Sequence, residues 1–368
     1  MRILFLCGSL EPGRDGVGDY TRRLASELLL QHHTVSVVAL NDRFVSEIYE
    51  GREEKGNICL VRIPGNYSNN QKISIAKEWT NKFNPDWISL QFVPFSFHHK
   101  GLPVNFSGFL SCIGGNHSWH IMFHELWTIT KSSLPSKIKL TGYFQRRIIK
   151  QLVKKLQPVS VHTQAQFSRH RLKRVGISAE ILPLFSNIPL TKEKGNNETL
   201  QNPGGQIRIV SFGSIYPNAL INRFAEDASS YERKYKVQIM LTLVGNSGPQ
   251  QFNWIAAWRN AGLTISVMGE MSVEGISEIL GTSTIGISST PFVMMEKSGS
   301  VAAMREHGLP VICIADPYSP KGFGFHPPDG IIDYFSNGFE KCINYQPKND
   351  SYHTVSDIAQ GFSTALTG

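Results

Sequence analysis

The segment EKSGSVAAMREHGLP, residues 296–310, places a lysine and several small residues where an apolar run gives way to a short helix. Ser298 is of the type that caps helix starts, and Gly308 and Pro310 predict an early helix end. The first turn then leaves backbone N–H groups without helical partners, those of Gly299, Ser300 and Val301. Such groups bind phosphate oxygens, and Lys297 adds a full positive charge beside them. The segment therefore predicts a diphosphate site.

A second candidate site is the glycine-rich loop GSLEPGRDGVGDY, which follows the first apolar run. We expect a helix to begin near Asp19, with its positive end favouring an anionic or polyhydroxylated ligand. The spacing does not match the GxGxxG of dinucleotide-binding proteins, and no acidic residue is evident at the end of the second predicted strand. A nicotinamide enzyme is therefore the weaker alternative, and glycines that only form turns are another.

Polar side chains also follow two later apolar runs. His124 and Glu125 come directly after the run ending in Phe123, and Gln91 ends the preceding predicted strand. A histidine in such a place can exchange protons near neutral pH, and Gln91 can hydrogen-bond sugar hydroxyls. Both residues can also be structural partners inside the protein. The motifs GxSxG, HExxH and the phosphate-binding P-loop do not occur, and no spacing of carboxylates indicates a glycoside hydrolase.

Two sets of strands must position these residues. Short apolar runs, separated in part by helix-like stretches, predict strands at 3–7, 35–40, 59–63, 87–92 and 120–123 and again at 207–212, 237–244, 264–268, 284–288 and 311–314. The polar stretch 191–206 separates the two sets. We predict an α/β protein of two doubly wound Rossmann-like domains, 1–190 and 191–368, facing each other across a cleft. The last helix is a candidate to cross back to the N-terminal domain.

Composition limits the classes of protein. The chain has 368 residues, a net charge of +8 and five cysteines without a CxxC pair, which predicts a cytoplasmic protein without disulfides or a zinc site. No apolar run is long enough to span a membrane, and the first residues read as a strand rather than a secretory signal. Positive charge is concentrated in 126–179, which contains no Asp or Glu. A basic amphipathic helix is predicted at 138–156.

This basic helix allows three interpretations: a solvated face, peripheral contact with an anionic membrane at its inner, cytoplasmic face, or nucleic-acid binding. No nucleic-acid-binding module accompanies the charge, so we expect no nucleic-acid partner.

Several motifs occur in one order along nearly the whole chain: the glycine-rich loop before GDYTRRLASELL, LQFVPFSF followed by KGLP, FHELW, LTLVGNSG and HGLPVI. In this order they resemble the GT-B glycosyltransferases, specifically glycosyltransferase family 4 (group 1). The resemblance implies a GT-B fold and a hexosyltransferase-type enzyme of carbohydrate biosynthesis. It would transfer a sugar from a nucleotide-diphosphate sugar, usually with retention and without an essential metal or other cofactor. The acceptor would be a sugar, a lipid-linked compound or a small molecule.

The resemblance also implies roles for individual residues. His124 would contact the donor sugar and help the reacting centre, and Glu296 would be a displaced substitute for a glutamate that binds sugar hydroxyls. The C-terminal domain would hold the donor through Gly213, Ser214, Gly245, Asn246, Gly269, Glu270, Met271, Lys297, Ser298, Gly299 and Ser300. The acceptor side would be formed by Gly16, Val17, Gly18, Asp19 and Gln91.

The sequence departs from the family's pattern at two places. After Gly213 the chain has Ser214 and Ile215 where the family's usual continuation supplies an arginine and later a lysine. The positions of the family's two glutamates fall on Met295 and Ala303. These departures leave open a sugar- or nucleotide-binding protein without catalysis, or a GT-B epimerase or phosphorylase.

Overall fold

The computed structural model describes residues 1–53, 58–128, 135–191, 205–348 and 352–368. These residues form two compact units: unit 1 comprises Met1–Pro183 and Val355–Gly368, and unit 2 comprises Leu184–Thr354. The boundary between the units therefore lies between Pro183 and Leu184, whereas the boundary predicted from the sequence was residue 190. Most of the predicted linker, 192–204, lies outside the described residues.

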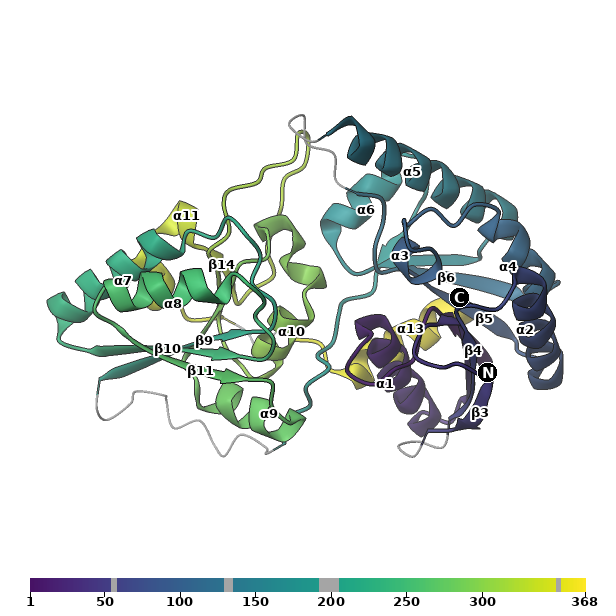
Figure 1. Ribbon diagram of the computed structural model, residues 1–368, viewed down its shortest axis with the longest axis horizontal. Helices are drawn as coiled ribbons and strands as arrows, with labels where there is room; N and C mark the ends of the chain where they lie inside the picture. The colour runs from purple at the N-terminus through teal and green to yellow at the C-terminus, as the bar shows by residue number, and fades with distance from the viewer. Residues whose placement is uncertain (54–57, 129–134, 192–204, 349–351) are drawn as a thin grey trace. The chain divides into compact units, whose positions relative to one another are not determined.

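Within the described part of the chain, unit 1 contains an eight-stranded sheet with the order β3-β4-β2-β1-β5-β6-β7-β8 (Figure 1). Its strands are β1 (Arg2–Cys7), β2 (Thr34–Asp42), β3 (Tyr49–Arg52), β4 (Cys59–Pro64), β5 (Trp87–Phe92), β6 (Ser118–Phe123), β7 (Ser160–Thr163) and β8 (Glu180–Ile181). All neighbouring strands are parallel except β3 and β4. The chain order reverses between β1 and β5, which makes their carboxyl ends the expected ligand-binding edge.

The helices of unit 1 cover this sheet. They are α1 (Gly16–Leu30), α2 (Asn69–Phe83), α3 (Pro94–Phe97), α4 (Phe106–Gly114), α5 (Ser136–Leu156), α6 (Gln166–Lys173) and α13 (Val355–Thr367). The C-terminal helix α13, yellow in Figure 1, lies beside the purple α1. Phe362 of α13 stacks on Phe5 of β1 with ring centroids 5.7 Å apart. The last residues of the chain therefore complete the core of its first half.

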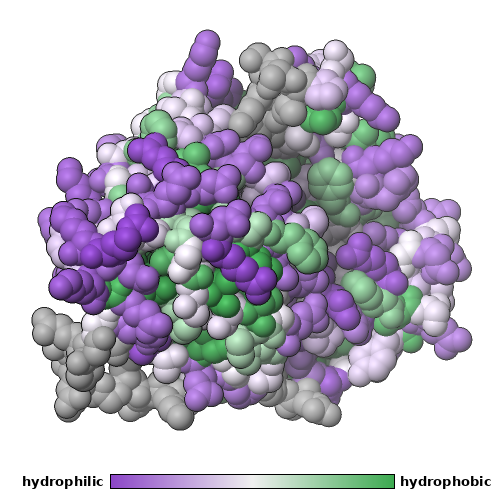
Figure 2. All heavy atoms as spheres, turned by 60° about the vertical axis from the view of Figure 1, so that its left-hand side comes forward, coloured by the Kyte–Doolittle hydropathy of each residue, from purple (hydrophilic) through white to green (hydrophobic). Residues whose placement is uncertain are grey.

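Unit 2 has a second parallel sheet, which in the described residues has the order β11-β10-β9-β12-β13-β14. Its strands are β9 (Gln206–Phe212), β10 (Gln238–Val244), β11 (Thr264–Gly269), β12 (Ile285–Ser288), β13 (Val311–Cys313) and β14 (Ile331–Asp333). The helices are α7 (Ile221–Tyr235), α8 (Gln251–Asn260), α9 (Val273–Thr282), the 3-10 helix η1 (Phe292–Lys297), α10 (Gly299–Glu306), α11 (Tyr334–Asn337) and α12 (Phe339–Ile343). Figure 2 shows the face of the molecule that lies on the left in Figure 1. Hydrophilic residues cover much of this face, and apolar residues are grouped near its middle.

Each strand predicted from an apolar run is present, and the basic helix predicted at 138–156 is α5. Two local predictions were wrong. Helix α1 begins at Gly16 rather than near Asp19, because Asp15 caps it. Strand β2 runs on to Asp42, so an acidic residue does end the second strand of the chain.

Candidate functional site

The glycine-rich loop and α1 start at the carboxyl end of β1. The carboxylate of Asp15 accepts hydrogen bonds from the backbone N–H groups of Val17 and Gly18 at 3.0 and 2.9 Å. These two N–H groups are therefore capped by an acidic side chain of the loop itself. A Cβ atom at Gly18 would lie 2.6 Å from the backbone oxygen of Ser9, so glycine is required where α1 meets the loop.

Asp19 fastens the tip of the same loop. Its carboxylate accepts from the backbone N–H of Gly13 at 3.1 Å and pairs with Arg22 at 3.5 Å. Burial raises the pKa of Asp19, against the lowering effects of the Gly13 hydrogen bond and of Arg22. Gly16, Val17, Gly18 and Asp19 thus lie together at this sheet edge, and their predicted contact with an acceptor stays a prediction.

Asp42, at the end of β2, holds the other side of the loop. It is fully buried and accepts from the Ser9 hydroxyl at 3.1 Å, the Leu10 N–H at 3.0 Å and the Arg62 guanidinium at 2.7 Å. Arg62 also pairs with Glu11 at 2.6 Å. The Arg62 hydrogen bond holds the pKa of Asp42 below its ordinary value although burial opposes this. Because this carboxylate is occupied by protein donors, it does not act as the ribose ligand of a dinucleotide-binding site.

His124 and Gln91 meet at the carboxyl ends of β6 and β5. Nε2 of His124 lies 2.8 Å from Oε1 of Gln91, and both residues are buried, with exposures of 7% and 1%. The ring of His124 also packs edge-on against Tyr20 of α1, with centroids 4.8 Å apart. Since Oε1 of an amide only accepts, Nε2 of His124 carries the proton in this arrangement.

The pair is the end of a longer buried polar chain. Nε2 of Gln91 donates to the Ser89 hydroxyl at 2.8 Å, which lies 2.8 Å from Nδ1 of His120. Nε2 of His120 lies 3.0 Å from Nδ1 of His162 on β7. If every link donates in the same direction, His120 accepts at Nδ1 and donates from Nε2, and its ring is neutral. Burial, followed by the nearby His162 and His124, keeps the pKa of His120 well below its ordinary value, in agreement with a neutral ring.

Sequence reasoning missed Ser89, His120 and His162. A usable signal was present, because Ser89 and Gln91 alternate on one strand and His120 lies on the next predicted strand. Polar residues at alternating positions in buried strands need hydrogen-bond partners on neighbouring strands. The sequence could therefore have predicted a buried polar chain across these strands, though not its individual hydrogen bonds.

In unit 2 the predicted donor-side glycines converge at the strand ends. Gly213, Gly245 and Gly269 follow or end β9, β10 and β11 and have positive φ angles of 80°, 82° and 65°. The N–H of Gly213 donates to the carbonyl of Val244 at 2.9 Å, and that of Gly245 donates to the carbonyl of Gly269 at 2.7 Å. The three turns therefore form one continuous edge.

The start of α10 adjoins this edge. A Cβ atom built on Gly213 would lie 3.7 Å from Cβ of Ser300, so the first turn of α10 lies against the turn after β9. Ser298 is the N-cap as predicted, and its hydroxyl accepts from the N–H of Val301 at 3.5 Å. Within the described residues, no hydrogen bond from the N–H groups of Gly299 or Ser300 is found. Gly213 and the first turn of α10 are thus direct neighbours.

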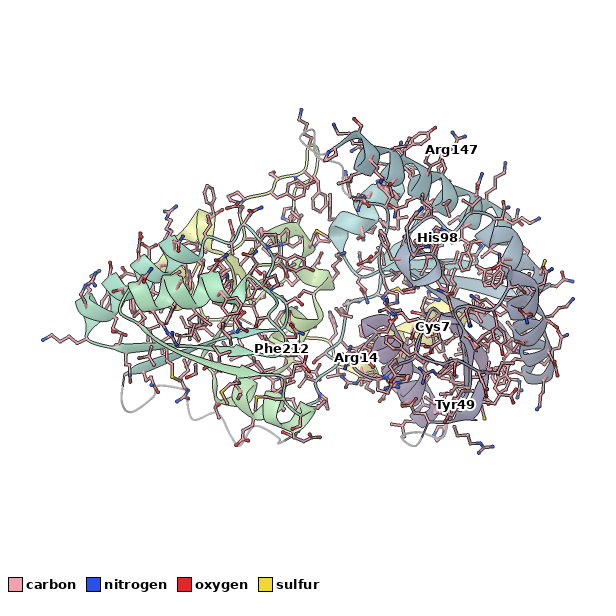
Figure 3. The ribbon with its side chains drawn as sticks, in the orientation of Figure 1. Cys7, Arg14, Tyr49, His98, Arg147 and Phe212 are labelled. Atoms are coloured by element: carbon pink, nitrogen blue, oxygen red, sulfur yellow. The ribbon has the colours of Figure 1, made fainter. Side chains whose placement is uncertain are left out.

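The remaining donor-side residues surround these turns. Asn246 is exposed, and its Nδ2 donates to Oε1 of Glu270 at 3.3 Å, which links the loops after β10 and β11. Ser214 is exposed, and Met271 packs in part against the apolar core. Glu296 and Lys297 end η1 and immediately precede the cap of α10. Phe212, which precedes Gly213, is labelled in Figure 3 at the end of β9.

The two positions that the resemblance assigns to glutamates are apolar and inaccessible. Met295 and Ala303 have no exposed surface and belong to the same buried cluster. A carboxylate at either place would be buried at a large cost in free energy without an ion partner. The departure from the family's pattern is therefore built into the packing of unit 2.

Among the residues that the structure describes, none of the helices has the length and apolar content that a membrane span requires. No group of three or more His, Cys, Asp or Glu side chains there is placed to hold a metal ion.

Solved structures resemble this chain over its full length. HepE from Anabaena, in complex with UDP and glucose, has a TM-score of 0.57 at 14% identity, covering 100% of this chain and 96% of HepE. A glycosyltransferase from Rickettsia africae has a TM-score of 0.54 at 16% identity, covering 100% and 88%. WaaG, a glycosyltransferase involved in lipopolysaccharide biosynthesis, has a TM-score of 0.53 at 13% identity, covering 100% and 90%. No protein-family model matches this chain, and no curated protein matches it in sequence.

At these identities the likeness establishes the fold. The chain has the two-domain GT-B fold, with one Rossmann-like parallel sheet in each unit, which confirms the fold predicted from the sequence.

Proposed function

We propose that this chain is a glycosyltransferase that moves a sugar from a nucleotide-diphosphate sugar to an acceptor. The observation that carries the proposal is the approach of Gly213 to Ser300, which sets the turn after β9 against the first turn of α10. Without a side chain at Gly213, the backbone of this turn can come close to a ligand at the helix start. The N–H groups of Gly299 and Ser300 and the charge of Lys297 have the character of a diphosphate site.

The reaction explains why positive charge is needed there. Transfer breaks the bond between the anomeric carbon and the diphosphate and forms a bond to an acceptor hydroxyl oxygen, which loses its proton. Negative charge builds up on the departing nucleoside diphosphate. Fixed N–H dipoles and Lys297 next to that diphosphate would stabilise this charge as it develops. We propose that the residues at the ends of β10 and β11, namely Gly245, Asn246, Gly269, Glu270 and Met271, border the nucleoside.

On unit 1 we assign the acceptor side to the β1–α1 loop and Gln91, and a catalytic role to His124. These residues lie at strand ends, at the edge where ligands of such sheets bind. In the neutral form of His124, with the Nε2 proton donated to Gln91, Nδ1 is the accepting nitrogen. We propose from the motif order that His124 acts at the donor sugar. The same motif order is the basis for proposing retention at the anomeric carbon, independence of metal and membership of glycosyltransferase family 4.

A second candidate is a protein that binds a nucleotide or sugar without transferring it. The burial of Met295 and Ala303 favours this candidate, because the two carboxylates usual in the family have no counterpart at these positions. Glu296 precedes the α10 cap by two residues and is the proposed substitute. The two candidates differ in turnover and agree in ligand binding.

We also propose that α5 contacts an anionic membrane or a lipid-linked acceptor. The helix exposes Leu140, Tyr143 and Phe144, at 56%, 42% and 46%, among basic side chains. Arg147, labelled in Figure 3, lies on the same helix and donates to the Tyr143 hydroxyl at 2.6 Å. Exposed aromatic and basic residues on one helix are typical of binding at a lipid interface.

Titration with UDP, UDP-glucose and other nucleotide-sugars, followed by thermal shift, tests the function. A ligand at a hundred times its dissociation constant should stabilise the folded state by about 2.7 kcal/mol. Stabilisation by one nucleotide family together with release of its nucleoside diphosphate in the presence of acceptors supports transfer. Stabilisation without turnover supports the binding protein. No stabilisation by any nucleotide contradicts both the transferase and a nucleotide-binding protein, and leaves only a protein that binds a sugar.

A further inference from the structure

Unit 1 contains a pocket of about 280 Å³ at the carboxyl end of β2. It is lined from the end of β2, the first turn of α2, the end of α3 and the segment leading into α4. Strand β2 lies next to β1, where the strand order reverses, so the pocket occupies an edge suited to ligands. Its volume is just below the roughly 300 Å³ at which pockets for drug-sized ligands begin, so it fits one compact group and its neighbours.

A buried cation lines this pocket. Lys72 of α2 is 6% exposed, and its Nζ donates to Oδ1 of Asn41 at 2.7 Å and to the carbonyl of Gly65 at 2.9 Å. Both acceptors are neutral. An ammonium group has three N–H donors, so one donor and the whole charge are left over. Burial lowers the pKa of Lys72, which reflects the cost of holding an ammonium group away from water.

Acidic residues of the described part of the chain do not neutralise this charge. Neither an ion pair to Lys72 nor an acidic pocket-lining residue is found there. Asp42, which follows Asn41 directly, is already bound to Arg62, Ser9 and Leu10. A buried charge is expected to be paired, so the partner of Lys72 is to be sought in a ligand.

One further donor and the start of a helix border the same pocket. Nδ1 of His98, a residue labelled in Figure 3, accepts from the N–H groups of Lys100 and Leu102 at 3.2 and 3.3 Å. The proton of the neutral ring is therefore on Nε2, which is a donor. Asn105 precedes α4 without a side-chain hydrogen bond to its first turn, so the positive end of that helix is uncapped by this residue.

Aromatic rings supply the other wall. Phe97, Phe106 and Phe109 line the pocket, with centroids 4.4 Å apart between the first two and 5.7 Å apart between the last two. Flat apolar surfaces of this kind pack against the carbon face of a sugar ring or against a short aliphatic stretch.

We propose that this pocket binds an acceptor through a phosphate or carboxylate group, with Lys72 as the ion partner and Nε2–H of His98 as a second donor. The aromatic wall holds the part of the acceptor next to the anion. The role as an acceptor site rests on the proposed sugar transfer, whereas the binding of an anionic compound rests on the pocket alone.

The test is calorimetric titration of the full chain, without nucleotide, with glucose 6-phosphate, glucuronate, glucose and farnesyl phosphate. We expect at least one of the anionic compounds to bind about tenfold or more tightly than neutral glucose. Binding of farnesyl phosphate alone indicates a lipid-borne phosphate, and binding of glucose 6-phosphate or glucuronate indicates a soluble anionic sugar. Equal binding of glucose and the anions, or no binding by any of the four, overturns the proposal.

Variants assign the binding to the pocket. Lys72→Met should weaken binding of the anion about tenfold or more, in line with the loss of a charge-assisted hydrogen bond. Lys77→Met is the matched control, because Lys77 is exposed on the same helix and the change in charge is identical. If Lys72→Met does not fold, His98→Asn takes its place, since Asn can still accept from the loop while lacking the Nε2 donor. A folded variant with unchanged anion affinity overturns the assignment.

This test can be separated from that of the proposed function. UDP is proposed to bind in unit 2, and the four probes are titrated without it. Binding of an anion in a protein that binds no nucleotide would remove the glycosyltransferase proposal and retain the anion site. Nucleotide binding without binding of any of the anions would remove the anion site and retain the glycosyltransferase proposal.

Discussion

Nε2 of His124 lies 2.8 Å from Oε1 of Gln91, and the Gln91 amide continues through Ser89 and His120 to His162. A strand-end histidine is thus fixed in one orientation by a chain of buried polar groups. Hydrogen bonds from such supporting residues keep a reacting side chain in its orientation during catalysis.

Replacing His124 by alanine should reduce the turnover of sugar transfer roughly a hundredfold, the lower part of the range for a group that acts on protons at the reacting centre. UDP affinity should stay within about twofold, because the diphosphate site is assigned to unit 2. Steady-state kinetics and calorimetry on the same sample make the comparison. Wild-type turnover in a folded His124→Ala protein would exclude this residue from the reaction.

Ser89→Ala should lower the free energy of unfolding by about 1–3 kcal/mol, since it leaves the Gln91 amide and the His120 ring without their shared partner. Ser111→Ala is a suitable control, because the Ser111 hydroxyl donates within α4, to the carbonyl of Ser107. Urea denaturation measures both. Equal losses in the two variants would mean that the buried chain contributes nothing specific.

Acidification should destabilise the protein through His120. The pKa of His120 is far lower in the folded protein than in the unfolded chain. Below about pH 6.5 this histidine is therefore protonated in the unfolded chain but stays neutral in the folded protein. The free energy of unfolding should therefore fall as the pH drops below that value, by up to about 1.4 kcal/mol per pH unit. His120→Asn should reduce the shift of the urea midpoint between pH 7.5 and 5, while His353→Asn, at an exposed position, should keep it. An unchanged shift in His120→Asn would assign the effect to other groups.

Lys297→Ala should weaken UDP binding by about 1.5–3 kcal/mol, the usual range for a hydrogen bond to a charged group, and leave uridine binding almost unchanged. The loss should be selective because Lys297 adjoins the α10 start rather than the strand-end loops proposed to border the nucleoside. Lys341→Ala removes an exposed lysine elsewhere in unit 2 and controls for net charge. Calorimetry with the two ligands decides, and equal losses for UDP and uridine would place Lys297 away from the phosphates.

Vesicle binding by α5 should rise with the fraction of anionic lipid and fall with salt, because surface attraction is screened within about 10 Å at 0.1 M. The double change Arg146→Gln with Arg147→Gln should weaken it, and so should Phe144→Ser, which removes an exposed ring. Arg259→Gln with Lys341→Gln lowers the charge equally in unit 2. Equal partitioning into neutral and anionic vesicles would leave α5 as a solvated helix.

The fold could be predicted because parallel strands buried on both faces are continuous apolar runs, as in β1. Short strands such as β8, with two residues, carry too little pattern to be recognised. The cap of α10 was foreseeable, since Ser298 acts through residues next to it in sequence. The start of α1 was misplaced because Asp15 and Asp19 are both of the type that caps helices, and only the loop geometry selects Asp15.

The less predictable features depend on residues far apart in the chain. Lys72 meets Asn41 across 31 positions, and His120 meets His162 across 42. Neither pair has a local spacing that a sequence pattern can reveal, because the sheet order brings the partners together. Residues of the unit 2 strand ends were easier to find, since glycines after apolar runs mark them directly.

The packing of α13 in unit 1 has a consequence for the order in which the protein matures on the ribosome. Domains of a nascent chain usually fold as they emerge, the N-terminal one first. Here the surface around Phe5 must wait for Phe362, which is synthesised after all of unit 2. Unit 2 is one continuous stretch of chain with its own sheet and core, so it can fold first, whereas the N-terminal half depends on residues translated after unit 2.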